Sequence, residues 1–267
     1  MSMQKSTFER LREIVYATSG ISLSDRKEAL VSARVGKRMR TLGILGYDNY
    51  LAYLEEHTGE VVGLLDAVST NVTSFFREPH HFEFLGEAVN HWYAAGQRRF
   101  RFWSAACSSG EEPYSLAIVL KEALPYPDVD MRILATDIST EVLGACERGE
   151  YSLRHIEPVS PSLRSRWFTT SGQGEDAVWS PNRHLRDMVV FRRMNLSTPP
   201  FPMNGPLDAI FCRNVMIYFD DAVRLRLLQE ATRLLKPGGF FFVGHAESLA
   251  GMLSDLKYVR PSIYRKV

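Results

Sequence analysis

The N-terminal part of the chain repeats its apolar residues at helical spacing and shows no strand alternation. Phe8 and Leu11 open the first such pattern, and Gly20 is placed to end it. A second pattern follows Asp25, a residue type that caps helices well. The helices that these patterns predict span residues 8–18, 26–42, 47–56 and 61–70. We therefore expect residues 1–75 to form an all-α domain.

From residue 98 onward, short apolar runs alternate with amphipathic ones. The predicted strands span residues 99–104, 131–136, 207–212 and 240–244, and the predicted helices 114–123, 141–147 and 220–235. This alternation is typical of a doubly wound, Rossmann-like α/β sheet, whose ligands bind at the carboxyl ends of its parallel strands. We expect residues 98–267 to form this domain, with residues 76–97 as a linker before it.

Residues 151–195 interrupt the alternation. Short β-type runs at residues 167–170, 177–179 and 188–191 surround a turn that contains Gly172 and Gly174. The pattern predicts a small antiparallel β-subdomain inserted in the parallel sheet. Such an insertion is either a binding appendage or an ordinary covering segment, and composition does not decide between them.

Composition narrows the class of protein. The chain has 267 residues, 45% of them hydrophobic and 24% charged, and a formal net charge of +1, which argues against a globally basic nucleic-acid binder. No apolar run is long enough for a bilayer, and the polar N-terminus is not a secretory signal. Three cysteines without metal spacing indicate reduced thiols. We expect a cytoplasmic monomer.

The most informative stretch reads Trp-Ser-Ala-Ala-Cys-Ser-Ser-Gly-Glu-Glu-Pro-Tyr-Ser over residues 103–115. It predicts a strand, a tight turn of small residues and a helix, which lets a ligand approach the backbone. Glu111 and Glu112 repel a pyrophosphate and attract a cation, and the single Gly110 fails the G-x-G-x-x-G pattern of NAD or FAD sites. S-adenosylmethionine, with its ammonium and sulfonium groups, fits this loop.

Asp137 follows the second predicted strand, where an acid can accept both ribose hydroxyls of a nucleoside. The alternative is a helix N-cap, a role that Ser139 is also placed to fill. Arg77 either binds a carboxylate or forms a salt bridge with a nearby acid such as Glu78. Tyr218 follows the third strand and either contacts the sulfonium by cation–π attraction or belongs to the core.

His80 and His81 are adjacent in the sequence, and no third ligand stands at metal spacing from them. We expect both on a helix surface and no metal site in the protein.

Several of these motifs, taken in order, resemble one family. They are Asn-Val-Thr-Ser-Phe-Phe-Arg-Glu at 71–78, the loop at 103–115, Ala-Thr-Asp-Ile-Ser at 135–139, Phe-Cys-Arg-Asn-Val-Met-Ile-Tyr-Phe at 211–219, and Leu-Lys-Pro-Gly-Gly at 235–239. The chain resembles the CheR family, the chemotaxis-receptor methyltransferases, over nearly its whole length. The resemblance implies transfer of methyl from S-adenosylmethionine to glutamate side chains of methyl-accepting chemotaxis proteins, with S-adenosylhomocysteine as the product.

The resemblance also implies a site. The cofactor contacts that it carries over fall on Asn71, Thr73, Arg77, Glu112, Asp137, Asn195, Leu196, Arg213 and Asn214. Arg77 and Tyr218 match the residues that frame the methyl group, and Glu112 matches the ammonium partner better than Glu111 does. The acceptor glutamate is already ionised at neutral pH, so no general base is required.

A basic cluster between residues 26 and 40 gives a second functional hypothesis. With the resemblance, Arg34, Lys37 and Arg38 are expected to dock an acidic receptor helix, and the β-subdomain to hold a receptor C-terminal peptide. Without it, the cluster is an ordinary solvated helix face. Two rival functions remain open: a methyltransferase for another acceptor, and a non-catalytic module that binds cofactor or receptor.

Overall fold

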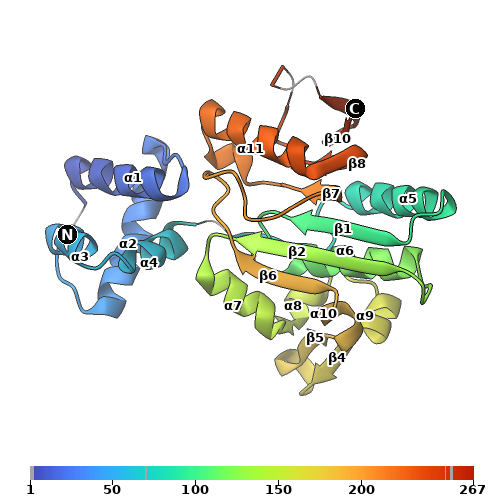
Figure 1. Cartoon of the computed structure of the whole chain (residues 1–267). Helices are drawn as coiled ribbons and strands as arrows, with labels where there is room; N and C mark the ends of the chain where they lie inside the picture. Colours follow the sequence, from blue (N-terminus) through green and yellow to red (C-terminus); the bar gives the residue numbers. More distant parts are fainter. Residues whose placement is uncertain (1–2, 70, 250, 253–254) are drawn as a thin grey trace.

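The computed structural model describes residues 3–69, 71–249, 251–252 and 255–267. A helical domain lies beside a larger α/β domain, and an extended segment from residue 71 onward joins them (Figure 1). None of the helices in the described ranges is long and apolar enough to cross a membrane.

The helical domain contains the four predicted helices. They are α1 (Lys5–Ser19), α2 (Glu28–Leu42), α3 (Tyr47–Glu56) and α4 (Glu60–Val68). Gly20 and Gly43 end α1 and α2 in the left-handed conformation, with φ near 70°, which glycine adopts without steric cost. Phe8, Leu11 and Val35 are fully buried in the domain's core. Thr70, the last residue of the predicted fourth helix, lies outside the described residues.

Asp25 does not cap α2, contrary to the sequence expectation. It begins a short 3₁₀ helix, η1 (Asp25–Lys27), and its side chain caps neither helix. The carboxylate instead accepts a hydrogen bond from Arg12 at 2.9 Å. The Asp25 carboxylate thus joins α1 to the segment before α2 instead of capping a helix.

The α/β domain is built on a seven-stranded sheet with the order β6-β2-β1-β7-β8-β10-β9. The strands are β1 (Arg99–Ser104), β2 (Asp130–Asp137), β6 (Val189–Arg193), β7 (Leu207–Phe211), β8 (Leu235–Phe242), β9 (Leu256–Arg260) and β10 (Ile263–Lys266). The first five in the spatial order pair in parallel, as the alternation predicts. β10 and β9 add an antiparallel edge that the sequence analysis did not predict.

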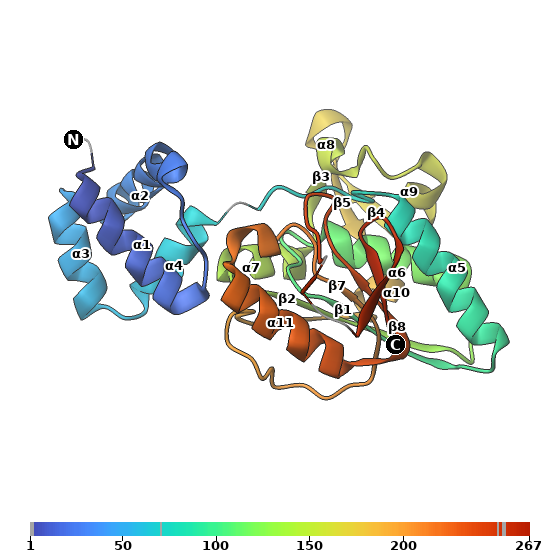
Figure 2. The ribbon, with the colours of Figure 1, turned by 90° about the horizontal axis from the view of Figure 1, so that it is seen from above.

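Helices cover both faces of the sheet. On one face, α5 (His80–Ala94) and α6 (Glu111–Ala123) bury Phe100 and Phe102, together with α7 (Thr140–Arg148). On the other face, α11 (Asp221–Leu234) packs against Trp103 and Ile210. Figure 2 shows α11 and α5 on opposite sides of the strands. The face under α5, α6 and α7 is dry. The other face is covered by α11 over β7 and β8, whereas Arg132 of β2 and Val190 of β6 are exposed.

The segment 76–97 differs from the linker that the sequence predicted. Most of it forms α5, in which Leu85 and Val89 are fully buried against the sheet. The two lie four residues apart and so share one helix face. The segment thus belongs to the layers of the α/β domain.

The inserted subdomain is a three-stranded antiparallel sheet with the order β3-β5-β4. Its elements are β3 (Tyr151–Ser152), α8 (Leu153–Ile156), α9 (Pro161–Trp167), β4 (Phe168–Ser171), β5 (Val178–Pro181) and α10 (Arg183–Arg186). The predicted hairpin around Gly172 and Gly174 is confirmed, and both glycines have positive φ. The run at 188–191 was assigned to this subdomain wrongly. It forms β6, whose Val189 pairs in parallel with Ile133 of β2.

Candidate functional site

A pocket lies between the helical domain and the carboxyl ends of the parallel strands, the edge that doubly wound sheets use for ligands. It holds about 1030 Å³ with its open mouth included, enough for a nucleoside joined to an amino acid. All the residues predicted for the cofactor or the methyl group line it. They are Asn71, Thr73, Arg77, Glu112, Asp137, Asn195, Leu196, Arg213, Asn214 and Tyr218.

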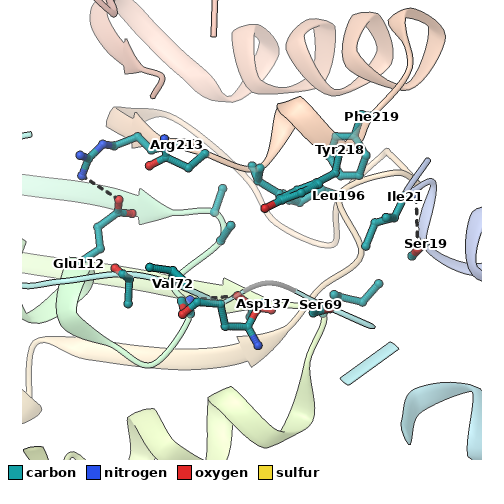
Figure 3. A pocket seen from close by; sticks show the side chains of 18 of the residues that line it. Ser19, Ile21, Ser69, Val72, Glu112, Asp137, Leu196, Arg213, Tyr218 and Phe219 are labelled. Carbon is teal, nitrogen blue, oxygen red and sulfur yellow. Dashed lines mark hydrogen bonds and ion pairs between the residues drawn. The ribbon is translucent and has the colours of Figure 1, made fainter. Parts of the chain in front are cut away.

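One end of the pocket carries a buried ion pair between a carboxylate and a guanidinium. Glu112, at the start of α6, accepts hydrogen bonds from Ser104 at 2.7 Å and from Arg213 at 3.0 Å. Arg213 also donates to Glu78 at 3.0 Å. Burial raises the pKa of the Glu112 carboxyl, and Arg213 opposes part of that rise. Figure 3 shows the Glu112–Arg213 pair at the far end of the pocket from the helical domain.

Glu111 does not face the pocket. It is buried, and its carboxylate accepts a hydrogen bond from Ser109 at 2.7 Å. Successive residues of a helix point in different directions, so only one of the two glutamates can reach the ligand. The structure places Glu112, not Glu111, on the pocket wall.

Asp137 lies at the end of β2 and lines the same pocket. Its oxygens accept the backbone N–H groups of Ser108 and Ser139, both at 3.0 Å. Burial raises the pKa of the Asp137 carboxyl, and these N–H donors oppose the rise. Ser139 caps α7 by accepting the N–H of Val142. The helix-cap role therefore falls to Ser139.

The segment before α5 brings Arg77 to the pocket. Its guanidinium donates to the backbone oxygen of Val72 at 2.9 Å, while the neighbouring Glu78 is paired with Arg213. Arg77 and Glu78 therefore have different partners, and the alternative of a salt bridge between them is wrong. Phe76 and Glu78 both have positive φ, a conformation that costs energy in residues other than glycine and that clusters at functional sites.

The loop after β7 carries Asn214, also with positive φ, at 58°. A buried carboxylate organises this loop. Glu247 accepts backbone N–H groups from Gly244 at 2.6 Å, Asn214 at 2.8 Å and Ile217 at 3.2 Å. The loop leads into η3 (Met216–Tyr218), which ends at the pocket residue Tyr218.

The helical domain closes the opposite end of the pocket. The N–H of Ser22 donates to the backbone oxygen of Tyr218 at 2.7 Å, and Ile21 forms a β-bridge with Phe219. The ammonium of Lys27 lies 4.4 Å from the centre of the Tyr218 ring. Sequence reasoning missed the helical-domain part of the wall, whose residues are Ser19, Ile21, Leu23, Lys27, Val68 and Ser69. The one sequence feature that could have indicated this part of the wall was Lys27, which belongs to the basic cluster at residues 26–40.

Comparison with known proteins decides the family. The family model for the all-alpha domain of CheR methyltransferases matches residues 6–69, and that for their SAM binding domain matches residues 71–264. The chain belongs to the CheR methyltransferase family.

Similar curated proteins cover nearly the whole chain. It is 40% identical to chemotaxis protein methyltransferase 2 of Pseudomonas aeruginosa, over 97% of this chain and 92% of the relative. It is 35% identical to the chemotaxis protein methyltransferase of Salmonella typhimurium, over 99% and 91%. For that of Escherichia coli the identity is 36%, over 94% and 87%.

S-adenosylmethionine is the cofactor of this CheR methyltransferase, and the pocket fits it. A buried carboxylate at one end suits an ammonium group, and an acid at the end of β2 suits ribose hydroxyls. The family assignment thus agrees with the pocket, whose lining residues include those that the sequence motifs predicted for the cofactor.

The predicted docking residues do not line the pocket, and two of the three have partners inside the helical domain. Arg34 donates to the backbone oxygens of Val68 and Ser69, at 2.9 and 2.6 Å. Arg38 makes two hydrogen bonds to the buried Glu60, at 2.9 and 2.7 Å. The third, Lys37, is exposed on α2.

The expectation of two surface histidines is wrong for His81, which is fully buried at the start of α5. A third histidine, His245, follows β8, and one ring nitrogen of each of the three lies within 4.8 Å of the others. No local pattern indicated this group, because 164 residues separate His81 from His245 (245 − 81).

Proposed function

We propose that the protein transfers methyl groups from S-adenosylmethionine to glutamate side chains of methyl-accepting chemotaxis receptors, forming methyl esters that adapt the receptor signal. It acts in the cytoplasm as a monomer. The observation that carries the choice of a carboxylate acceptor is the position of Lys27. Its ammonium stands on the pocket wall beside Tyr218.

Among the described residues, Lys27 has no carboxylate partner, although it is partly buried and burial lowers its pKa. A partly desolvated cation without a counter-ion favours an anionic ligand. An acceptor carboxylate that enters from the helical-domain side meets this ammonium next to Tyr218. A neutral or cationic acceptor gains nothing from it.

The pocket residues then divide the work. S-adenosylmethionine, when bound, supplies an electrophilic methyl group. Glu112 holds the ammonium, Asp137 the ribose, and Asn71, Thr73, Asn195, Leu196, Arg213 and Asn214 complete the cofactor contacts. Arg77 and Tyr218 frame the methyl group from two sides, and Lys27 orients the acceptor. Positioning and exclusion of water are the main catalytic effects, because a glutamate with a pKa of about 4.3 is already ionised at neutral pH.

Receptor docking is assigned to the exposed cations of α2, with Lys37 as the one predicted residue free to reach a partner. Arg34 and Arg38 contribute by holding α2 in place. The inserted subdomain offers a second contact. β4 lies at the edge of its three-stranded sheet in the described part of the chain, and an edge strand can pair with an extended receptor C-terminal peptide.

The proposal is tested with S-adenosylmethionine that carries a labelled methyl group and with membranes that contain chemotaxis receptors. Methyl esters release their label as methanol in mild alkali, whereas methylated amines keep it. We expect alkali-labile label on the receptor band. Label that survives alkali, or label only on small molecules, would move the function to another acceptor; cofactor binding without any transfer would make the protein a binding module.

A further inference from the structure

Three histidines converge next to the cofactor pocket without lining it. His80 and His81 are the first two residues of α5, and His245 lies in the loop that follows β8. The Nε2 atoms of His80 and His245 lie 3.3 Å apart. Two nitrogen ligands with bonds of about 2.0–2.1 Å at a tetrahedral metal are separated by roughly the same distance.

His81 adds a buried imidazole to this group. Its side chain is fully buried, and neither ring nitrogen has a hydrogen-bond partner among the described residues. Imidazole is the commonest side-chain metal ligand in proteins, and it binds through a ring nitrogen that carries no proton.

Glu78 has the position of an outer-shell carboxylate. One of its oxygens lies 3.4 Å from His81 Nδ1, and the other accepts the backbone N–H of His245 at 3.1 Å. A carboxylate beside Nδ1 can hold the ring proton there and leave Nε2 for an ion. Histidines that bind metals commonly have such a partner.

The electrostatic balance also permits a cation. The buried Arg213 is close enough to act on His81, but its guanidinium is paired with the carboxylates of both Glu78 and Glu112. His80 is half-buried and His245 is exposed, so an ion can enter from solvent and the two rings can rotate toward it.

We propose that His80, His81 and His245 form a binding site for one divalent transition metal ion of the zinc type, with solvent as the remaining ligand. Imidazole ligands favour Zn²⁺, Co²⁺, Ni²⁺ and Cu²⁺ over Mg²⁺ and Ca²⁺. The ion fastens the start of α5 to the loop after β8. Through Glu78 and Arg213 this clamp supports Glu112 in the cofactor pocket.

The test uses full-length protein without a histidine tag, treated with chelator and titrated with Co²⁺ as a spectroscopic probe. We expect saturation at one ion per chain, absorption bands in the visible region, and displacement by Zn²⁺. His245→Gln and His80→Gln, changes at accessible rings, should each weaken Co²⁺ binding by at least about tenfold. His91→Gln removes an exposed histidine at the other end of α5 and should leave binding unchanged.

Thermal unfolding gives an independent readout. Zn²⁺ should raise the midpoint of the wild type and of His91→Gln, and should leave that of His245→Gln unchanged, because an ion that binds only the folded state stabilises it. Absence of saturable Co²⁺ binding, or equal affinity in His245→Gln and His91→Gln, would overturn the proposal. Circular dichroism shows whether each variant is folded.

Discussion

Arg213 and Glu112 form a buried ion pair in the cofactor pocket, with 3.0 Å between guanidinium nitrogen and carboxylate oxygen. Arg213 is 5% exposed, and its second nitrogen is held by Glu78. Burial raises the pKa of Glu112, and the Arg213 guanidinium opposes that rise while it holds the carboxylate on the pocket wall. A carboxylate oxygen has two lone pairs, so Glu112 can accept from a ligand ammonium as well as from its protein partners.

Glu112→Gln should therefore weaken S-adenosylhomocysteine binding by roughly tenfold to a hundredfold, the range for loss of a charge-assisted hydrogen bond. Calorimetric titration measures the change. Glu111→Gln is the matched control, because Glu111 is buried beside the same helix terminus but pairs with Ser109. An equal loss in both variants would show that the effect is a general one of the loop.

Acidification should weaken cofactor binding at a higher pH than the pKa values of exposed carboxyl groups would predict. Burial raises the pKa values of Glu112 and Asp137, so both take up protons at higher pH than surface acids do. Only the ionised forms pair with an ammonium and accept from both ribose hydroxyls. The affinity for S-adenosylhomocysteine should fall as pH is lowered from neutrality, and the fall should be shallower in Glu112→Gln. A parallel decline in wild type and variant would contradict this assignment.

Substitutions of Arg38 and Lys37 should have different effects, the first on stability and the second on receptor docking. Arg38→Gln leaves Tyr50 as the one side-chain partner of the buried Glu60 among the described residues and should cost roughly 1.5–3 kcal/mol of stability. Lys37→Glu should leave the unfolding midpoint nearly unchanged and reduce methyl transfer to receptors. Denaturant unfolding and transfer assays measure the two effects. Reduced stability without reduced transfer in Lys37→Glu would remove this residue from the docking surface.

Lys27→Gln should raise the KM for receptor without changing the affinity for S-adenosylhomocysteine, because the ammonium is assigned to the acceptor. Lys27→Arg keeps the charge and should restore part of the loss. Lys257→Gln, on the edge strand β9, is a control for loss of a lysine charge far from the pocket. A changed cofactor affinity with an unchanged KM would place Lys27 on the cofactor instead.

Much of the fold and pocket could be predicted from the sequence because the signals are local. The glutamates of the 103–115 loop and Asp137 each follow a strand, and parallel strands bring their carboxyl ends to one edge. Lys27 was missed as a pocket residue because its contact with Tyr218 joins segments 191 positions apart (218 − 27). The burial of His81 was missed for the same reason, since the helix face that it occupies is set by β8.

The linker and the subdomain boundary show a different limit. Periodicity indicated neither that α5 packs on the sheet nor that β6 pairs with β2, since both depend on which surface lies nearby. The partners of Arg34 and Arg38 could not be predicted for the same reason. A charged helix face looks solvated in sequence, whereas here its members bind a helix end and a buried acid.

The most direct test maps the methylated residue. A receptor cytoplasmic fragment is incubated with the protein and S-adenosylmethionine, digested near neutral pH and sequenced by tandem mass spectrometry. We predict methyl groups on glutamate side chains of the receptor's acidic helices, and none when those glutamates are replaced by alanine. Methyl groups on lysine, arginine or cysteine, or an unmodified receptor alongside confirmed cofactor binding, would contradict the proposed function.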